Sequence, residues 1–361
     1  MLDFVTEKES VWELLRRTTK PIALYGMGNG ADKILDWCEA QGVQVQGVFA
    51  SDEFVRGQQF RGFTVEHYDA LKARLGEELL VVIAFASERP EVLSRFRQLA
   101  EEQEVVAPHL PLFSEEETVS EEWLTKHESE LKEVYERLAD DESRIVFANT
   151  LNYKLSGKIS YLFQCETQRR EDLRQLIRPD AHESYLDLGA YNGDTIQELG
   201  ELTDWRWREV IAVEPDRRNC RKLRALAEQL AQRGLAVEVH EKGIWNTVCE
   251  LSFSDSGGRQ STFMGAQKRA VPVTTIDEVT AGRHISYIKM DVEGAEVQAL
   301  AGGVRTITQY KPKLFVAAYH YDVDLFRLPQ LIWQLVPDYK VYLRKHPYVP
   351  AWELNFIAVS N

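Results

Sequence analysis

Short apolar runs that end in glycine or an acidic residue recur along the chain, and each is followed by a stretch with helical spacing. In the second half of the chain they begin at Tyr185, Glu209, Leu235, Ser286, Lys313, Lys340 and Asn355. This alternation is typical of an α/β fold, in which helices join parallel strands. The last two strands follow one another through a short turn, which predicts a final antiparallel hairpin.

A shorter series of the same kind lies nearer the N-terminus. It comprises an apolar strand from Pro21, a glycine turn, a helix, a second strand and another apolar run at 79–87. We therefore expect a small Rossmann-like α/β domain over residues 1–112, an acidic helical linker over 113–142 and a larger domain over 143–361. The linker carries most of the net charge of −14, and we interpret its acidic residues as a solvated face. They include Glu115, Glu116, Glu117, Glu121, Glu122, Asp140, Asp141 and Glu142.

Composition and charge exclude several classes of protein. The negative charge argues against a nucleic-acid-binding protein, which needs clustered Lys and Arg. The four cysteines form no CxxC pair, so neither a zinc site nor a disulfide framework is indicated. We find no secretory signal and no segment able to span a bilayer, and we expect a cytoplasmic protein.

The most informative motif is Tyr-Leu-Asp-Leu-Gly-Ala-Tyr-Asn-Gly-Asp-Thr, which joins a strand to a helix from Tyr185 onward. Gly189 and Gly193, with Ala190 between them, allow a tight turn that approaches a ligand. Asp194 or Thr195 is expected to cap the following helix. Since every nucleotide-binding α/β fold has such a turn, the motif alone does not choose the ligand.

The next strand limits which ligand the site could bind, because Glu214 lies at its end, followed by Pro215 and a helix. A carboxylate there can accept hydrogen bonds from both hydroxyls of a ribose. The turn does not read G-x-G-x-x-G, and Asp187 adds a second carboxylate. These features favour S-adenosylmethionine, a sulfonium cation without phosphates, over NAD. The simpler interpretation is that the glycines only form a turn and Glu214 only caps a helix.

Three carboxylates follow another strand, at Asp291, Glu293 and Glu296. The carboxyl ends of parallel strands form the ligand-binding edge of an open sheet, so Asp291 and Glu293 should face the same crevice as Glu214. Three carboxylates could bind Mg²⁺. Glu293 and Glu296 could instead only stabilise the start of a helix.

His320 comes directly after the next strand, on the same edge. Histidine is a natural general base for a hydroxyl that attacks a methyl group. We therefore predict His320 as that base, with Asp291 as the alternative. His346, at the end of a later strand, is a weaker candidate.

These residues carry a resemblance to the FkbM family of methyltransferases. It rests on YLDLGAYNGDT, the VEPD strand end, TTIDEV at 274, and above all IKMDVEGAEVQALAGG with KPKLFVAAYHYDVDLFRLP, and extends from about Ser143 to the C-terminus. The resemblance implies a seven-stranded class I methyltransferase fold and S-adenosylmethionine as cofactor. It also implies O-methylation of a hydroxyl, on a sugar, a glycan or a related small-molecule natural product.

The resemblance also implies roles for individual residues. Those that would bind the cofactor are Asp187, Gly189, Ala190, Gly193, Asp194, Glu214, Pro215, Gly243 and Ile244, and those that would act in catalysis are Asp291, Glu293 and His320. Gly243 and Ile244 fall where the family contacts adenine. The chain departs from the family at Tyr191-Asn192 in the glycine turn and at Trp245 beside the adenine wall.

The N-terminal domain has a Gly-Met-Gly-Asn-Gly turn from Gly26 to Gly30, and Asp52 follows its second strand. This resembles the nucleotide-sugar-binding domains found beside sugar-modifying enzymes. A domain that only packs, or that forms a homo-oligomer, stays equally open. Two other functions also stay open: an NAD-dependent sugar oxidoreductase, and a non-catalytic protein that binds S-adenosylmethionine or a nucleotide sugar.

Overall fold

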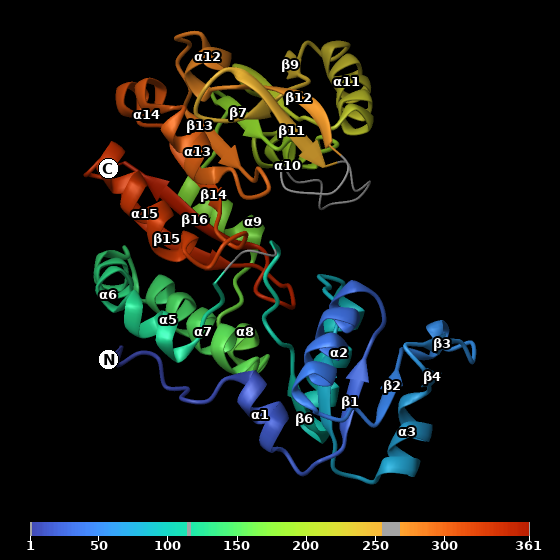
Figure 1. Ribbon diagram of the computed structural model, residues 1–361. Helices are drawn as coiled ribbons and strands as arrows, with labels where there is room; N and C mark the ends of the chain where they lie inside the picture. The colour runs from blue at the N-terminus through green and yellow to red at the C-terminus, as the bar shows by residue number, and fades with distance from the viewer. Residues whose placement is uncertain (1, 114–116, 255–267, 361) are drawn as a thin grey trace. The chain divides into compact units, whose positions relative to one another are not determined.

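The computed structural model describes residues 2–113, 117–254 and 268–360, so Glu115 and Glu116 of the predicted linker lie outside the described residues. The chain divides into two compact units (Figure 1). Unit 1 comprises Met1–Lys132, Arg144–Glu166 and Lys345–Glu353. Unit 2 comprises Glu133–Ser143, Thr167–Arg344 and Leu354–Asn361.

Neither unit is continuous in sequence, whereas the predicted ranges 1–112, 113–142 and 143–361 are. Residues 144–166 and 345–353 fall inside the predicted larger domain, yet their contacts assign them to unit 1. A sequence marks a boundary only where its composition changes. It gives no signal for a segment that returns to a distant part of the chain.

Unit 1 contains, among its described residues, a six-stranded sheet in the order β3-β4-β2-β1-β5-β6. Its strands are β1 Ile22–Tyr25, β2 Gly47–Phe49, β3 Gln59–Phe60, β4 Phe63–Glu66, β5 Leu80–Ile83 and β6 Glu104–Val106. The central strand β1 pairs in parallel with β2 and β5, and only β3 runs antiparallel to its neighbour. This arrangement confirms the predicted small Rossmann-like domain.

Helices cover both faces of this sheet. Residues of α1 Val11–Arg17 and α2 Asn29–Gln41 contribute to the core on one face, and residues of α3 Tyr68–Leu75, α4 Pro90–Glu102, α7 Asp141–Ser156 and α8 Ser160–Gln164 to the core on the other. Between α4 and α7 the chain forms α5 Glu121–Lys126 and α6 Glu128–Arg137. Successive β1 side chains enter two different cores, with Ala23 and Tyr25 in one and Ile22 and Leu24 in the other. Both faces of β1 are therefore buried, which explains its unbroken apolar sequence.

Unit 2 is built on a seven-stranded sheet, counted over the described residues, in the order β15-β16-β14-β13-β7-β8-β9. Its strands are β7 Ser184–Leu188, β8 Glu209–Val213, β9 Val237–His240, β13 Tyr287–Met290, β14 Lys313–Ala317, β15 Lys340–Lys345 and β16 Leu354–Val359. Strand β16 is antiparallel to β14, whereas β14, β13, β7, β8 and β9 are parallel neighbours. The predicted parallel sheet with an antiparallel end is confirmed.

The helices of unit 2 are α9 Arg169–Asp172, α10 Asp194–Leu202, α11 Arg217–Ala231, α12 Ile276–Thr280, α13 Glu296–Ala301, α14 Val304–Tyr310 and α15 Asp324–Leu335. Figure 1 shows α11 beside β9, and the Asp216 side chain caps the first turn of α11 by accepting hydrogen bonds from the amides of Arg218 and Asn219.

Unit 2 also contains a second sheet, which was not predicted. It has the order β10-β12-β11, from β10 Gly243–Ile244, β11 Cys249–Ser254 and β12 Lys268–Thr274.

The predicted helical linker contains α5, α6 and the start of α7, and its apolar residues at helical spacing are buried, as Leu131 and Leu138 show. The acidic residues are not all solvated. Arg344, only 3% exposed, forms ion pairs with Asp140 at 2.6 Å, Glu142 at 3.0 Å and Asp172 at 3.3 Å. Burial raises the pKa of Asp140, but hydrogen bonds from Arg344 and Ser143 outweigh it and hold that pKa below its ordinary value. Part of the acidic run is therefore a structural contact of unit 2.

Replacing Arg344 with Gln should lower the free energy of unfolding by about 3 kcal/mol, because the buried carboxylate of Asp172 and the partly buried one of Asp140 lose their counter-charge. Chemical denaturation followed by tryptophan fluorescence would measure the change. Arg327→Gln is the matched control, since Arg327 is exposed on α15. A loss in Arg344→Gln no larger than in this control would contradict the structural role.

Candidate functional site

The loop after β7 packs directly against the end of β13. Gly189 has φ +75°, and a Cβ atom placed on it would lie 1.8 Å from the carbonyl oxygen of Asp291. Gly193 has φ +88°, and its Cβ would lie 2.4 Å from Leu226. Both glycines are therefore required by close packing within the fold, in addition to any approach of a ligand.

The side chain of Asp187, on β7, contacts residues that hold this loop in place. It is fully buried, it accepts a hydrogen bond from the Thr195 hydroxyl, and it lies 3.5 Å from Lys289 Nζ, its register partner on β13. Lys289 Nζ also donates to the Gly189 carbonyl at 2.8 Å. Burial alone would lower the pKa of Lys289, but Asp187 and Asp291 raise it above its ordinary value. In this structure Asp187 thus forms a buried ion pair that holds the loop, and its contact with a cofactor stays a prediction.

Glu214 lies at the end of β8, opposite the same loop. Its carboxylate accepts hydrogen bonds from the backbone amide of Tyr191 at 2.9 Å and from that of Asp216 at 2.8 Å. The side chain is 6% exposed, and burial raises its pKa to about 7. A carboxylate can accept about four hydrogen bonds, so this one retains capacity for a diol.

The other predicted cofactor residues occupy different positions around this edge. Ala190 is buried and its amide donates to the Val213 carbonyl, whereas Asp194 is exposed at the start of α10. Gly193, not Asp194 or Thr195, is the N-cap of that helix. Pro215 is partly exposed after Glu214. Gly243 and Ile244 are buried in β10, where they pair with β12.

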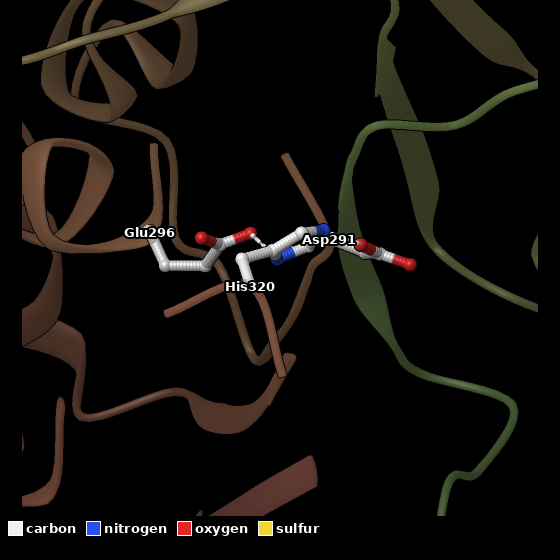
Figure 2. Close-up of side chains that lie close together, drawn as sticks. All are labelled: Asp291, Glu296 and His320. Carbon is white, nitrogen blue, oxygen red and sulfur yellow. Dashed lines mark ion pairs between the residues drawn. The ribbon is translucent and has the colours of Figure 1, made fainter. Parts of the chain in front are cut away.

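Four side chains gather after β13 and β14, and we name Asp291, Glu293, Glu296 and His320 the β13–β14 cluster. Figure 2 shows the His320 ring with Glu296 and Asp291 on opposite sides. Its Nδ1 lies 3.1 Å from Glu296, and its Nε2 lies 3.4 Å from Glu293 and 3.7 Å from Asp291. Tyr319, which the sequence analysis missed, donates its hydroxyl to both oxygens of Asp291, at 3.1 and 3.2 Å.

Exposure separates the members of this cluster. His320 and Glu296 are each 1% exposed, whereas Asp291 is 31% and Glu293 is 35% exposed. Glu293 also has φ +55°, in the left-handed region that few non-glycine residues adopt. The carboxylates of Asp291 and Glu293 can therefore meet a substrate.

His320 differs from the free base that the sequence suggests. Burial lowers its pKa, but the facing carboxylates, led by Glu296, outweigh burial and raise that pKa well above its ordinary value. A buried imidazolium surrounded by carboxylates is poorly placed to accept a proton from a hydroxyl. His346 is buried in unit 1, where its Nδ1 lies 3.9 Å from Glu353.

The glycine turn of unit 1 lies between β1 and α2. A Cβ on Gly26 would meet Phe85 at 2.4 Å and one on Gly30 would meet the Ala84 carbonyl at 2.3 Å, whereas Gly28 has nothing within 4 Å. Asp52 is exposed and lies 2.7 Å from His67. The first and third glycines of this turn thus serve packing against the segment that follows β5.

Residues 187–349 match the family model described as the methyltransferase FkbM domain. The chain carries an FkbM methyltransferase domain. This match is shorter than the expected resemblance from Ser143 to the C-terminus, but it includes the glycine loop, Glu214 and the β13–β14 cluster. The matched residues include β8, β9, β13, β14 and β15 of the unit 2 sheet.

One solved structure shares the fold of this chain over nearly its whole length. A methyltransferase FkbM from Methylobacillus flagellatus KT has a TM-score of 0.74 at 21% identity, over 99% of this chain and 95% of that one. A precorrin-6y C5,15-methyltransferase from Geobacter metallireducens GS-15 has a TM-score of only 0.33 at 10% identity, over 52% of this chain and 85% of that one. No curated protein matches the chain.

Gly189→Ala should destabilise the FkbM domain by about 3 kcal/mol or more, because the new methyl group would collide with the Asp291 carbonyl. Gly234→Ala is the matched control. Gly234 has φ +77°, close to that of Gly189, but nothing within 4 Å of its Cβ position. The control should lose only about 1 kcal/mol, from backbone conformation alone. Equal losses in denaturant unfolding would show that the close contact is unimportant.

Proposed function

We propose that this protein is an S-adenosylmethionine-dependent O-methyltransferase. The observation that carries the proposal is the buried carboxylate of Glu214, held at the end of β8 opposite the glycine loop. Its two oxygens are oriented by the backbone amides of Tyr191 and Asp216 and retain acceptor capacity. That is the group needed to bind the two hydroxyls of a ribose.

The charge of this sheet edge also fits the cofactor. Glu214, Asp291 and Glu293 all follow the carboxyl ends of strands in one sheet. A sulfonium cation without phosphates is attracted by such carboxylates, whereas a dinucleotide would be repelled through its pyrophosphate. S-adenosylmethionine, when bound, supplies a methyl group that a nucleophile can attack.

Asp291 and Glu293 would act on the acceptor. We assign them to orient a hydroxyl and remove its proton, since both carboxylates are about one-third exposed. The oxygen gains a bond to the methyl carbon as the carbon–sulfur bond breaks and sulfur keeps that electron pair, while the proton leaves to the cluster. Positioning of the two reactants would provide much of the acceleration. Tyr319 would hold Asp291, and Glu296 would hold His320.

The acceptor is proposed to be a hydroxyl of a sugar, a glycan or a related natural product. A nucleotide sugar at the Gly26–Gly30 turn of unit 1, assembly into a homo-oligomer and a cytoplasmic location stay predictions. No helix of the described residues is both long and apolar enough to cross a membrane.

Glu214→Gln should weaken S-adenosylmethionine binding by about tenfold to a hundredfold, since hydrogen bonds to a charged acceptor are worth about 1.5–3 kcal/mol. Isothermal titration with S-adenosylmethionine and S-adenosylhomocysteine would measure this loss. Because burial raises the pKa of Glu214 to about 7, affinity in the unaltered protein should fall as pH drops below about 7 and level off above it. The variant should lack this dependence. A similar pH profile in both proteins, or no binding to the unaltered protein, would refute the assignment.

Glu293→Gln should lower turnover by about 10²–10⁴-fold, because the change removes a proton acceptor. Cofactor affinity should fall less than in Glu214→Gln, because the ribose site is untouched and only one of the carboxylates that attract the sulfonium is lost. Conversion of S-adenosylmethionine with a panel of sugars and nucleotide sugars would first identify an acceptor. Glu228→Gln, an exposed carboxylate of α11, is the control and should keep full turnover. Unchanged turnover in Glu293→Gln would remove Glu293 from the reaction.

A further inference from the structure

The β13–β14 cluster contains an imidazole ring that is removed from water without hydrogen bonds to satisfy it. His320 is 1% exposed, and within the described residues neither Nδ1 nor Nε2 has a hydrogen-bond partner. One oxygen of Glu296 is also buried without a hydrogen-bond partner among the described residues. The nearby carboxylates are at ion-pair distance but outside hydrogen-bond geometry. Buried polar atoms normally have partners, so these nitrogens indicate a missing ligand.

The two sides of the His320 ring are not equivalent. On the Nδ1 side, Glu296 lies 3.1 Å away and is itself fixed, because the same oxygen accepts from the Val292 amide at 2.9 Å. On the Nε2 side, Glu293 and Asp291 approach to 3.4 and 3.7 Å, and both are partly exposed. The Nε2 side therefore combines three donor groups with an opening to solvent.

We propose that a divalent transition-metal cation binds between His320 Nε2, Asp291 and Glu293, with Glu296 orienting the ring from the Nδ1 side. A carboxylate behind a metal-binding histidine is the usual means of fixing that ring. Because the cluster supplies imidazole nitrogen as well as carboxylate oxygen, it suits Mn²⁺, Fe²⁺ or Zn²⁺ better than the Mg²⁺ that three carboxylates alone suggest. Tyr319 would hold Asp291 in place from outside.

Charge and distance support this site. Three carboxylates surround one imidazole, so a divalent cation offsets negative charge that the ring alone leaves unbalanced. His320 Nε2 already lies 3.4 Å from a Glu293 oxygen and 3.7 Å from an Asp291 oxygen, so both proposed carboxylate ligands are close to the ring nitrogen. Metal ligands lie about 2.0–2.2 Å from the ion, so binding draws the exposed carboxylates inward. Their partial exposure leaves room for that movement.

The cation would have a role in the reaction, and this part of the inference rests on the proposed function. An acceptor hydroxyl that reaches the open side of the cluster could bind the cation through its oxygen. The cation would lower the pKa of that hydroxyl, so that its proton passes more readily to an oxygen of Asp291 or Glu293 that is not bound to the cation. Binding of the cation itself does not depend on the identity of the acceptor.

The test uses the full-length protein after treatment with a chelator. Mn²⁺ and Zn²⁺ are titrated by calorimetry, and bound Mn²⁺ is followed by electron paramagnetic resonance. We expect one Mn²⁺ per chain and electron spin echo modulation from a directly bound imidazole nitrogen. Asp291→Asn and Glu293→Gln should each weaken binding by about tenfold or more, since each loses a charged ligand. Glu228→Gln should bind as the unaltered protein does, and thermal unfolding would confirm that each variant folds.

Three results would overturn the site: no binding of either cation at about 1 mM, cation affinity in Asp291→Asn and Glu293→Gln equal to that of the unaltered protein, or no nitrogen modulation. His320→Gln should abolish the modulation, but its buried position makes the two partly exposed carboxylates the primary test. S-adenosylmethionine titrated into the same chelator-treated protein separates the two proposals. Loss of cofactor binding with Mn²⁺ binding intact would refute only the proposed function, and the reverse would refute only the metal site.

Discussion

The contact between Gly189 and the carbonyl of Asp291 is the constraint on which the site depends. It brings the loop after β7 against the end of β13 more closely than any side chain would allow. The buried pair of Asp187 and Lys289 reinforces the contact, because Lys289 also binds the Gly189 carbonyl. Since the same loop presents the Tyr191 amide to Glu214, the predicted ribose site and the β13–β14 cluster are joined through a few backbone atoms.

Unit 2 has two groups of acidic side chains, and their negative charge is balanced in different ways. Around Arg344, Asp140, Glu142 and Asp172 share one buried guanidinium, so the negative charge is compensated within the protein. At the carboxyl edge of the sheet, by contrast, Glu214 is held mainly by backbone amides and acids outnumber the single imidazole of the cluster. Such an edge costs stability and is better explained by a cationic ligand than by folding.

The pattern of apolar residues along the chain predicted the strands of the main sheet but not those of the smaller sheet. The runs at 184–188, 209–213 and 287–290 are strands as expected, because they are mostly apolar and buried on both faces. Asp187 and Lys289, the charged residues within the first and third runs, pair with each other. The sheet of β10, β11 and β12 was missed, since those strands are short or carry charged residues such as Lys268 and Glu250. Gly243 and Ile244 consequently belong to a strand and not to an open loop.

The sequence by itself determined the fold class, the glycine loop, the acid at the end of β8 and the acids after β13, because each depends on residues close together in the chain. Only the tertiary structure decided the roles within that set. It buried His320 between carboxylates from another strand end, engaged Asp187 with Lys289, and moved residues 345–353 into unit 1. These outcomes depend on contacts between segments that are distant in the sequence. Such contacts set the burial of a side chain and the charges around it, which the sequence does not give.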